Sequence, residues 1–523
     1  MMEEECSPIK TLQALLDWRD TVQHRGEPFK DKVSNSSGCT PPKTLLCHDM
    51  MGGYLEDRFV NGSKDCNSYR FYHWDNIDIF VYFSHYLVTI PPVGWINAAH
   101  RHNVKVLGTF ITEWKDGSKL LQRIKDDNLI SQVATKLADI ADAYRFDGWL
   151  MNIESEMGTD CGPFMEDFLS AVTQNVHKSV EASVVLWYDS FVHSGKLEWQ
   201  NELNDLNKPF FDRCDGIFVN YAWAEENLKK SADVAGSRKA DVYVGVDVFA
   251  RETLYSGGYE TYKAVEQARK FGLSAAIFAP GWVHETQEKE KFTENQCRLW
   301  NFPKELRSSR RYTSLPIKTN FCQGFGQKTF EAGKVVREEP WFNLSKQELQ
   351  PICQGLNDRG GMHLATVYTD DAFCGGGCLK IEFSPHEKEA SKPEFRLFNC
   401  NVPIDEDLCV SYTFKMLTNG EDKISLVLVA KDGADRKRRF QLGVAALDEG
   451  HQRRRHKFDE NILLLPTEEI KSCSTQNGWV TRNYVLERKE YDGLTLVRIC
   501  FSFKSPESRT CLLGQMTIIP GKE

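Results

Sequence analysis

The chain has 523 residues, a length that predicts two to four domains. Its residues are 41% hydrophobic and 11% aromatic, which is typical of a globular protein with ample buried core. The formal net charge of −9 argues against a nucleic-acid-binding protein, because such proteins carry a strongly basic surface.

Residues 1–38 predict a polar N-terminal arm with one amphipathic stretch at 12–18. The first ten residues, MMEEECSPIK, have neither the positive region nor the apolar region of a signal peptide. No run of 18 or more apolar residues occurs in the sequence, so we expect no membrane span. We therefore expect a cytosolic protein whose 16 Cys are reduced and whose glycosylation sequons at Asn35, Asn61 and Asn343 stay unmodified.

Short apolar runs recur between about residues 43 and 283, and helical patterns such as 129–144 and 164–176 separate several of them. The runs lie at 44–47, 79–82, 104–109, 147–153, 183–187, 216–219, 242–246 and 275–278. Strands that alternate with helices at this spacing are typical of parallel βα units. Eight units predict an α/β fold, a (β/α)8 TIM barrel over residues 39–318. Asp147-Gly148 and Asp215-Gly216 introduce two of the strands, as if one turn were used twice.

The pattern changes past residue 319, where helical periodicity fades and Gly-rich turns separate alternating apolar runs, for example at 408–416, 424–430 and 494–503. This predicts a β-rich accessory region over 319–523, with one or two sandwich-like modules. A basic cluster, Arg436 to Arg439 with Arg453 to Arg455 nearby, lies among acidic neighbours, and we expect it to form a solvated loop face.

Polar and aromatic residues follow each apolar run of the expected barrel, and the ends of parallel strands meet on the face that carries active sites. The segment FDGWLMNIESEM, residues 146–157, shows this most clearly. Asn152 and Glu154 stand at i and i+2 of a strand, so both side chains point to the same side, whereas Trp149, Met151 and Ile153 have the outward parity. The strand rise separates the two inward groups by roughly 6.6 Å. The alternative is a structural hydrogen-bonded pair at the barrel rim, because N-x-E alone is a weak signal.

One Glu with one Asn suits the hydrolysis of a 2-acetamido sugar. A retaining glycosidase usually needs two carboxylates about 5–5.5 Å apart. The carbonyl oxygen of a 2-acetamido group can itself attack the anomeric carbon, so the enzyme needs one general acid/base and one group that holds the acetamide N–H. An amide accepts that hydrogen bond without a charge. Glu154 would have to be protonated at rest, which burial beside aromatic rings favours.

The run FDGWLMNIE, with WYDS at 187–190, FVNYAW at 218–223, GVDVFARE at 245–252 and FAPGWVHE at 278–285, resembles the cytosolic endo-β-N-acetylglucosaminidases of glycoside hydrolase family 85. The resemblance covers the expected barrel. It implies cleavage between the two GlcNAc residues of the N-glycan chitobiose core, with retention, through an oxazolinium intermediate, and with transglycosylation as a second outcome. It implies Glu154 as the acid/base, Asn152 as the acetamide-orienting residue and Tyr188 as a tyrosine that contacts the acetamide carbonyl. The expected partners are N-glycans, free oligosaccharides or glycopeptides.

Further strand-end residues are weaker candidates for binding sugar. The aromatic candidates for stacking on sugar faces are Trp114, Trp187, Trp223, Phe249 and Trp282. The candidates for hydrogen bonds to sugar hydroxyls are Asn220, Asp247 and Glu285. The spacing of His48, His73 and His85 matches no metal motif, and neither does that of the Cys residues, so we expect no metal and no cofactor.

Two other function classes stay open at the level of the sequence. The first is a catalytically silent barrel lectin, against which the presence of Glu154 argues. The second is a chitinase-like or amylase-like hydrolase, against which Asn152 argues, because chitinases carry an acidic D-x-E pair at the matching place. Release of glycan from a glycopeptide and activity on chitin oligomers separate these alternatives.

Overall fold

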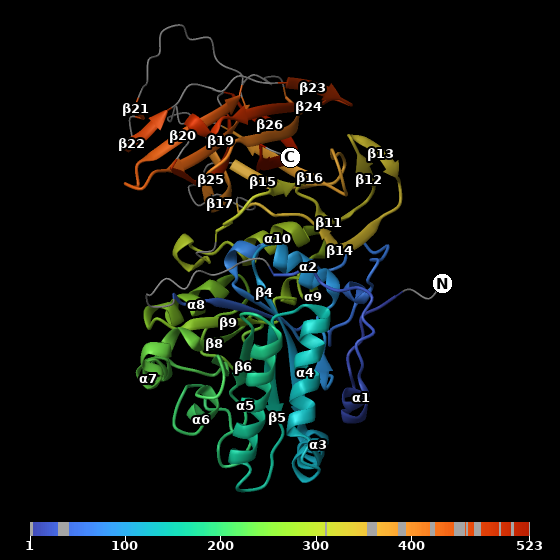
Figure 1. The fold of residues 1–523 in the computed structure, drawn as a ribbon, viewed down its shortest axis with the longest axis vertical. Helices are drawn as coiled ribbons and strands as arrows, with labels where there is room; N and C mark the ends of the chain where they lie inside the picture. Colours follow the sequence, from blue (N-terminus) through green and yellow to red (C-terminus); the bar gives the residue numbers. More distant parts are fainter. Residues whose placement is uncertain are drawn as a thin grey trace. The chain divides into compact units, whose positions relative to one another are not determined.

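The computed structural model describes residues 4–29, 41–308, 311–352, 363–384, 394–418, 424–443, 455–456, 459–464, 472–490, 493–503 and 507–521. It divides the chain into two compact units, one of Met1–Ser63 with Trp74–Ser308 and one of Lys64–His73 with Ser309–Glu523 (Figure 1). The three-part division expected from the sequence, 1–38, 39–318 and 319–523, stays a prediction. Asn35, Arg453 and Arg454 lie outside the described residues.

Eight parallel strands of the first unit close into a barrel, as the apolar runs predicted. The strands pair in the order β2-β1-β9-β8-β7-β6-β5-β4, and β4 pairs back with β2. The barrel strands are β1 Thr44–His48, β2 Ile79–Tyr82, β4 Lys105–Glu113, β5 Gly148–Glu154, β6 Val184–Tyr188, β7 Gly216–Val219, β8 Val242–Asp247 and β9 Ser274–Phe278. The sequence did not predict β3 (Val88–Thr89), which pairs antiparallel with β4.

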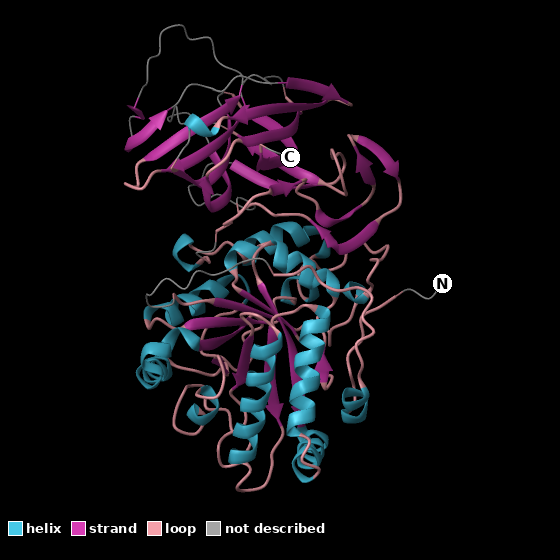
Figure 2. Cartoon of the chain, in the orientation of Figure 1, coloured by secondary structure: helices cyan, strands magenta, loops and turns pink. Residues whose placement is uncertain are grey.

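Helices lie around this barrel and connect its strands (Figure 2). The α-helices are α1 Leu12–Asp17, α2 Val93–Arg101, α3 Trp114–Asp126, α4 Ile130–Tyr144, α5 Gly162–Ser179, α6 Lys208–Phe211, α7 Glu225–Ala235, α8 Thr261–Lys270, α9 Trp282–Glu285 and α10 Phe292–Leu299. The patterns expected at 129–144 and 164–176 correspond to α4 and α5. The long helices bury one face only, for example Val133, Leu137 and Ile140 of α4, as amphipathic periodicity requires.

In three places, an aspartate that precedes one barrel strand accepts a hydrogen bond from the backbone near the start of the neighbouring strand that comes before it in the chain. Oδ2 of Asp78 accepts a hydrogen bond from Thr44 N at 2.8 Å. Asp147 does the same for Val106 N and Asp215 for Val185 N, each at 2.7 Å. The repeated Asp-Gly dipeptide of the sequence is therefore a strand-start device that pairs a carboxylate with an otherwise unpaired N–H.

The side chains that point inward from the barrel strands fill the interior of the barrel. Strand β5 shows how inward and outward residues alternate. Leu150 belongs to the interior cluster, together with residues of the other barrel strands such as Leu107 and Leu186. Trp149 has the opposite parity, and its indole N–H donates to the carbonyl of Leu137 on α4 at 3.1 Å. Asn152 and Glu154 share the inward parity of Leu150, as predicted.

The second unit is a β-sandwich. Its strands are β10 Ile317–Thr319, β11 Gln323–Gly326, β12 Thr329–Glu331, β13 Lys334–Arg337, β14 Trp341–Gln347, β15 His363–Tyr368, β16 Cys378–Phe383, β17 Glu394–Ile404, β18 Leu408–Met416, β19 Ile424–Lys431, β20 Lys437–Gly443, β21 Arg455–His456, β22 Asp459–Leu464, β23 Ser472–Gln476, β24 Trp479–Leu486, β25 Leu494–Phe503 and β26 Arg509–Pro520. One sheet has the order β15-β16-β26-β18-β24-β23 with β10 beside β26, and the other has the order β17-β25-β19-β20-β22-β21.

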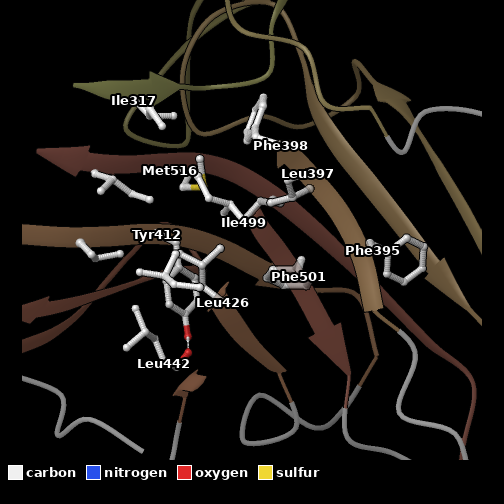
Figure 3. Packing of buried hydrophobic residues seen from close by; sticks show 14 of the residues in the cluster. Ile317, Phe395, Leu397, Phe398, Tyr412, Leu426, Leu442, Ile499, Phe501 and Met516 are labelled. Carbon is white, nitrogen blue, oxygen red and sulfur yellow. Dashed lines mark hydrogen bonds between the residues drawn. The ribbon is translucent and has the colours of Figure 1, made fainter. Parts of the chain in front are cut away.

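The core of the sandwich draws side chains from both sheets, such as Tyr412 and Met516 from one and Leu426 and Phe501 from the other (Figure 3). The buried Tyr412 hydroxyl donates to the carbonyl of Leu442 at 2.9 Å, so this polar group is satisfied inside the core.

The basic cluster at 436–439 is only in part the solvated loop that the sequence predicted, because Arg436 lies in the loop before β20 with its side chain 71% exposed, whereas the next three residues lie in a strand. Lys437, Arg438 and Arg439 belong to β20, and Arg439 is largely buried in an ion pair with Glu394. Side chains point to alternate faces of a strand, so a basic residue can keep its charge in an ion pair on one face while its neighbours fill the core on the other. For this reason a run of basic residues can belong to a strand and need not form a loop.

Candidate active site

Asn152 and Glu154 lie at the C-terminal end of β5, on the inward side of the strand. Asn152 is 3% exposed, and Glu154 is half-buried. The register of the parallel pair β4–β5 sets Glu113 beside Glu154. Two carboxyl groups and one amide therefore meet at this edge of the barrel.

The environment of Glu154 raises the pKa of its carboxyl. Burial raises the pKa of this carboxyl above its ordinary value, and the negative charge of Glu113 raises it further. The nearby Asn152 amide and the His85 ring act in the opposite direction. His85 binds Glu113 directly, with 2.9 Å between Nδ1 and Oε1. A carboxyl that keeps its proton more readily than an ordinary Glu suits general acid catalysis.

The Asn152 side chain interacts with Glu154 and makes no closer hydrogen bond through its amide nitrogen. It lies near enough to the Glu154 carboxyl to lower the pKa of that group. Its buried Nδ2 has no partner at normal hydrogen-bond distance and angle among the residues that the structure describes. Most buried amide groups in proteins are satisfied, so a buried one left unpaired stands out. Because the two ends of an Asn amide can exchange by rotation, either its N–H or its carbonyl can face a ligand here.

Tyr188 ends β6 with its ring in the interior cluster of the barrel. It is 5% exposed, and its hydroxyl donates to Asn220 Oδ1 at 2.9 Å. Burial and the neighbouring charge of Glu154 raise the pKa of the Tyr188 hydroxyl well above its ordinary value. Tyr188 is therefore a neutral hydroxyl that can donate a hydrogen bond. Asn220, expected to bind sugar, instead has a protein partner at each end of its amide.

Three of the expected aromatic residues present a reachable ring. Trp114, the first residue of α3, follows β4 directly and is 64% exposed, a large apolar area for a single side chain. Phe249 and Trp282 are half-buried. Trp282 meets the ring of Tyr259 edge-on at 5.2 Å, which fixes the indole while part of it stays accessible. Glu285, at the end of α9, is exposed. These four residues remain candidates for binding substrate.

Trp187 and Trp223 are packing residues in this structure, contrary to the prediction that they stack on sugars. Trp187 is fully buried and stacks on Phe210 of α6 at 4.5 Å, because it has the opposite parity to Tyr188. Trp223 is 4% exposed, stacks on Tyr255 at 4.9 Å, and donates its indole N–H to the carbonyl of Gly245 at 2.7 Å.

Asp247 is also occupied by protein partners instead of being open to a sugar hydroxyl. Its carboxylate is 2% exposed and accepts two hydrogen bonds from the Arg251 guanidinium, at 2.8 and 3.1 Å. The backbone N–H groups of Phe249 and Arg251 also donate to it. Asp247 therefore shapes the loop that follows β8.

Glu113, His85 and Tyr221 also lie at the site, although they were not among the site residues predicted from the sequence. Glu113 could have been found from strand register, because it ends β4 as Glu154 ends β5. The His85 partner lies 28 residues away in the chain, and no motif connects the two. The half-buried Tyr221 packs its ring against Tyr188 at 6.4 Å and Phe278 at 5.4 Å, a contact that only the closed barrel creates.

Among the described residues, no group of three or more His, Cys, Asp or Glu is placed to hold a metal ion. In the same part of the chain, no helix is both long enough and apolar enough to cross a membrane.

The model of the glycosyl hydrolase family 85 matches residues 54–329, which is more than half of the chain. The chain belongs to glycosyl hydrolase family 85. As a member of this family it is a glycoside hydrolase, and the family match begins before β2 and extends past the last barrel strand.

Relatives of this family 85 chain cover nearly all of it. The cytosolic endo-beta-N-acetylglucosaminidase of Homo sapiens is 41% identical over 530 residues, which are 98% of this chain and 70% of the relative. The cytosolic endo-beta-N-acetylglucosaminidase 1 of Arabidopsis thaliana is 35% identical over 544 residues, 98% of this chain and 75% of the relative. These relatives place the chain among the endo-β-N-acetylglucosaminidases of the family.

A solved structure supports the fold over the same extent. The glycoside hydrolase domain of Endo-D from Streptococcus pneumoniae R6 matches with a TM-score of 0.74 and 18% identity, covering 100% of this chain and 84% of that chain. A barrel followed in the chain by antiparallel sheets is therefore a fold that this chain shares with the Endo-D domain.

Proposed function

We propose that this family 85 enzyme cleaves the β-1,4 bond between the two GlcNAc residues of the N-glycan chitobiose core, with retention and with assistance from the substrate's own 2-acetamido group. The observation that carries the proposal is the inward pair on β5. A carboxyl whose pKa is raised by burial stands two residues from a buried amide whose nitrogen makes no hydrogen bond of normal distance and angle among the described residues. The relatives are named endo-beta-N-acetylglucosaminidases, which supports a cut beside an N-acetylglucosamine residue.

In the first half of the reaction, Glu154 donates its proton to the glycosidic oxygen of the leaving GlcNAc. The acetamide carbonyl oxygen attacks the anomeric carbon as that bond breaks, and an oxazolinium ion forms. Asn152 holds the acetamide N–H and stabilises the positive charge that develops on the group. Tyr188, at the end of the neighbouring strand β6, supplies a neutral hydroxyl for the acetamide carbonyl.

In the second half, a water molecule attacks the anomeric carbon from the face that the leaving group vacated. The Glu154 carboxylate takes the proton of that water, and the oxazoline ring opens to restore the acetamide. Two inversions at the same carbon give net retention. A sugar hydroxyl in place of water gives transglycosylation by the same step.

The proposed substrates are N-glycans on glycopeptides and the related free oligosaccharides. Trp114, Phe249 and Trp282 offer apolar ring area to the C–H faces of sugars, and Glu285 offers a carboxylate to their hydroxyls. Because the relatives are named cytosolic enzymes, we propose that the protein acts in the cytosol.

Mass spectrometry of a ribonuclease-type high-mannose glycoprotein after incubation with the enzyme tests the bond that is cut. A single GlcNAc left on the glycosylated Asn is the expected product. Loss of the whole glycan would identify an amidase, and an unchanged glycoprotein that still binds the protein would identify a lectin.

Asn152→Ala separates the two halves of the reaction. The variant should fail to release glycan from intact glycoprotein, because nothing orients the acetamide. It should still transfer a preformed glycan oxazoline to a GlcNAc acceptor, since Glu154 acts there as base on a ring that already exists. Liquid chromatography of both reactions measures the difference.

Equal loss of both Asn152→Ala reactions, with an unchanged circular dichroism spectrum, would make Asn152 a general binding residue. Full hydrolysis by the variant would contradict the assisted mechanism.

A further inference from the structure

The loop that follows β6 is built around a buried carboxylate next to Tyr188. Asp189 is 0% exposed. Its oxygens accept hydrogen bonds from Asn201 N at 2.8 Å and from Asn207 Nδ2 at 2.9 Å. A third donor is Gln200 N at 3.2 Å. Because every one of these partners is a donor, the carboxylate fixes the backbone of residues 200–201 close to the end of β6.

Asn201 is held in the left-handed region, with φ 57°, and this places its side chain against the end of β7. Its Oδ1 accepts two hydrogen bonds, from the backbone N–H of Ala222 at 3.1 Å and from Asn220 Nδ2 at 2.8 Å. A backbone N–H can only donate, so the atom of Asn201 that it contacts must be the oxygen.

This one constraint sets the orientation of the Asn220 amide and, through it, of the Tyr188 hydroxyl. Since Asn201 presents an oxygen, Asn220 must turn its nitrogen toward Asn201. The Asn220 oxygen then faces Tyr188, whose hydroxyl donates to it at 2.9 Å. The direction of the Tyr188 O–H bond is therefore decided by an Asn two hydrogen bonds away, on a different loop.

We propose that Asn201 is a positioning residue that sets the place and the proton direction of the Tyr188 hydroxyl through Asn220. The proposal rests on the role of Tyr188 in the proposed function. With Asn220 fixed, the Tyr188 hydroxyl donates to Asn220 Oδ1 before substrate binds, and rotation about its C–O bond turns the same O–H to the acetamide carbonyl in the complex. If the Asn220 amide were free to turn, its nitrogen would also face Tyr188, and the hydroxyl would lose its single orientation.

The test is a double-mutant cycle between positions 201 and 188, read as kcat and KM for release of glycan from a glycopeptide. Asn201→Gly removes the acceptor, and glycine tolerates the positive φ. It should lower kcat about tenfold with KM within about threefold, because the interaction matters most in the transition state. In the Tyr188→Phe background the same substitution should change kcat by less than about twofold, because there is no hydroxyl left to orient.

Two further variants separate positioning from loss of structure. Asn201→Asp keeps an acceptor oxygen for both donors and tolerates the left-handed backbone, so kcat should stay within about threefold of wild type. Asn204→Ala is the matched control on the same loop. Its amide nitrogen binds Gln200 and Glu202 and makes no link to Asn220, so activity should be unchanged.

An equal loss of kcat from Asn201→Gly in the wild-type and Tyr188→Phe backgrounds would overturn the proposal and leave the proposed function intact. Wild-type kcat in Asn201→Gly itself, or the failure of Asn201→Asp to restore turnover in a folded protein, would also overturn it. Full turnover by Tyr188→Phe would remove Tyr188 from the mechanism and the positioning role with it, while losses in Glu154→Gln and Asn152→Ala would still support the assisted reaction.

Discussion

A glutamine at position 154 would keep the shape of the side chain and remove the proton that the leaving sugar needs. Glu154→Gln should therefore lose glycan hydrolysis by about 10²–10⁴-fold, the usual contribution of a general acid. The measurement is the rate of GlcNAc-peptide formation from a high-mannose glycopeptide.

The thermal melting curve of Glu154→Gln is the control, because the substitution is nearly isosteric and the fold should be unchanged. Near-normal turnover by the folded variant would remove Glu154 from the mechanism.

The charges beside Glu154 should set the alkaline limit of activity. Glu113 raises the pKa of the Glu154 carboxyl, so Glu113→Gln lowers that pKa. Activity that depends on protonated Glu154 falls as pH rises through this pKa, so the alkaline limb of the kcat/KM profile should move to lower pH.

His85→Gln provides the matched comparison. His85 lowers the pKa of Glu154, so its removal should move the same limb of the profile to higher pH. Profiles measured in parallel for both variants decide the point. Shifts in the same direction, or none, would mean that these two residues do not set the pKa of the catalytic carboxyl.

At the scale of elements, the strand that carries Asn152 and Glu154 depends on the glycine at its start. Gly148 has φ 139°, and a Cβ there would lie 1.9 Å from the carbonyl oxygen of Val184 on β6. Gly148→Ala should lower the free energy of unfolding by about 2–5 kcal/mol, because it adds both backbone strain and a clash with main chain.

Gly158→Ala is the control for this substitution. Gly158 lies just after β5, and a Cβ there would have no atom within 4 Å. Its melting temperature should match that of wild type, and a Gly148→Ala variant as stable as Gly158→Ala would show that β5 and β6 can separate at little cost. Thermal unfolding followed by circular dichroism measures both.

At the scale of the whole molecule, each unit has a hydrophobic core of its own, so stability and catalysis should respond to different substitutions. Phe501 is 0% exposed in the core of the second unit. Phe501→Ala should destabilise that unit by about 3–5 kcal/mol. Below its melting temperature the variant should keep wild-type kcat, because no residue of this core belongs to the barrel.

Leu417→Ala is the matched control, since Leu417 is 47% exposed and its loss should change the free energy of unfolding by less than about 0.5 kcal/mol. Calorimetry and steady-state kinetics on the full chain give the two readouts. A loss of kcat in folded Phe501→Ala would contradict the expectation that the core of the second unit does not affect catalysis.

The sequence by itself determined the barrel and the location of the candidate site. The eight apolar runs became the eight parallel strands, because a strand buried on both faces must be apolar along its length. The same alternation set the inward side of Asn152 and Glu154. The motifs of the family lie at the ends of these strands, where the apolar runs stop.

Only the tertiary structure decided which strand-end residues stay open. Trp187 ends one apolar run and Trp114 follows another, yet Phe210 covers the first and the second is 64% exposed. Asp247 turned out to be saturated by Arg251, and the orientation of Tyr188 depends on Asn201. Exposure and hydrogen-bond partners depend on loops that meet only after the barrel closes, and local periodicity carries no record of such distant contacts.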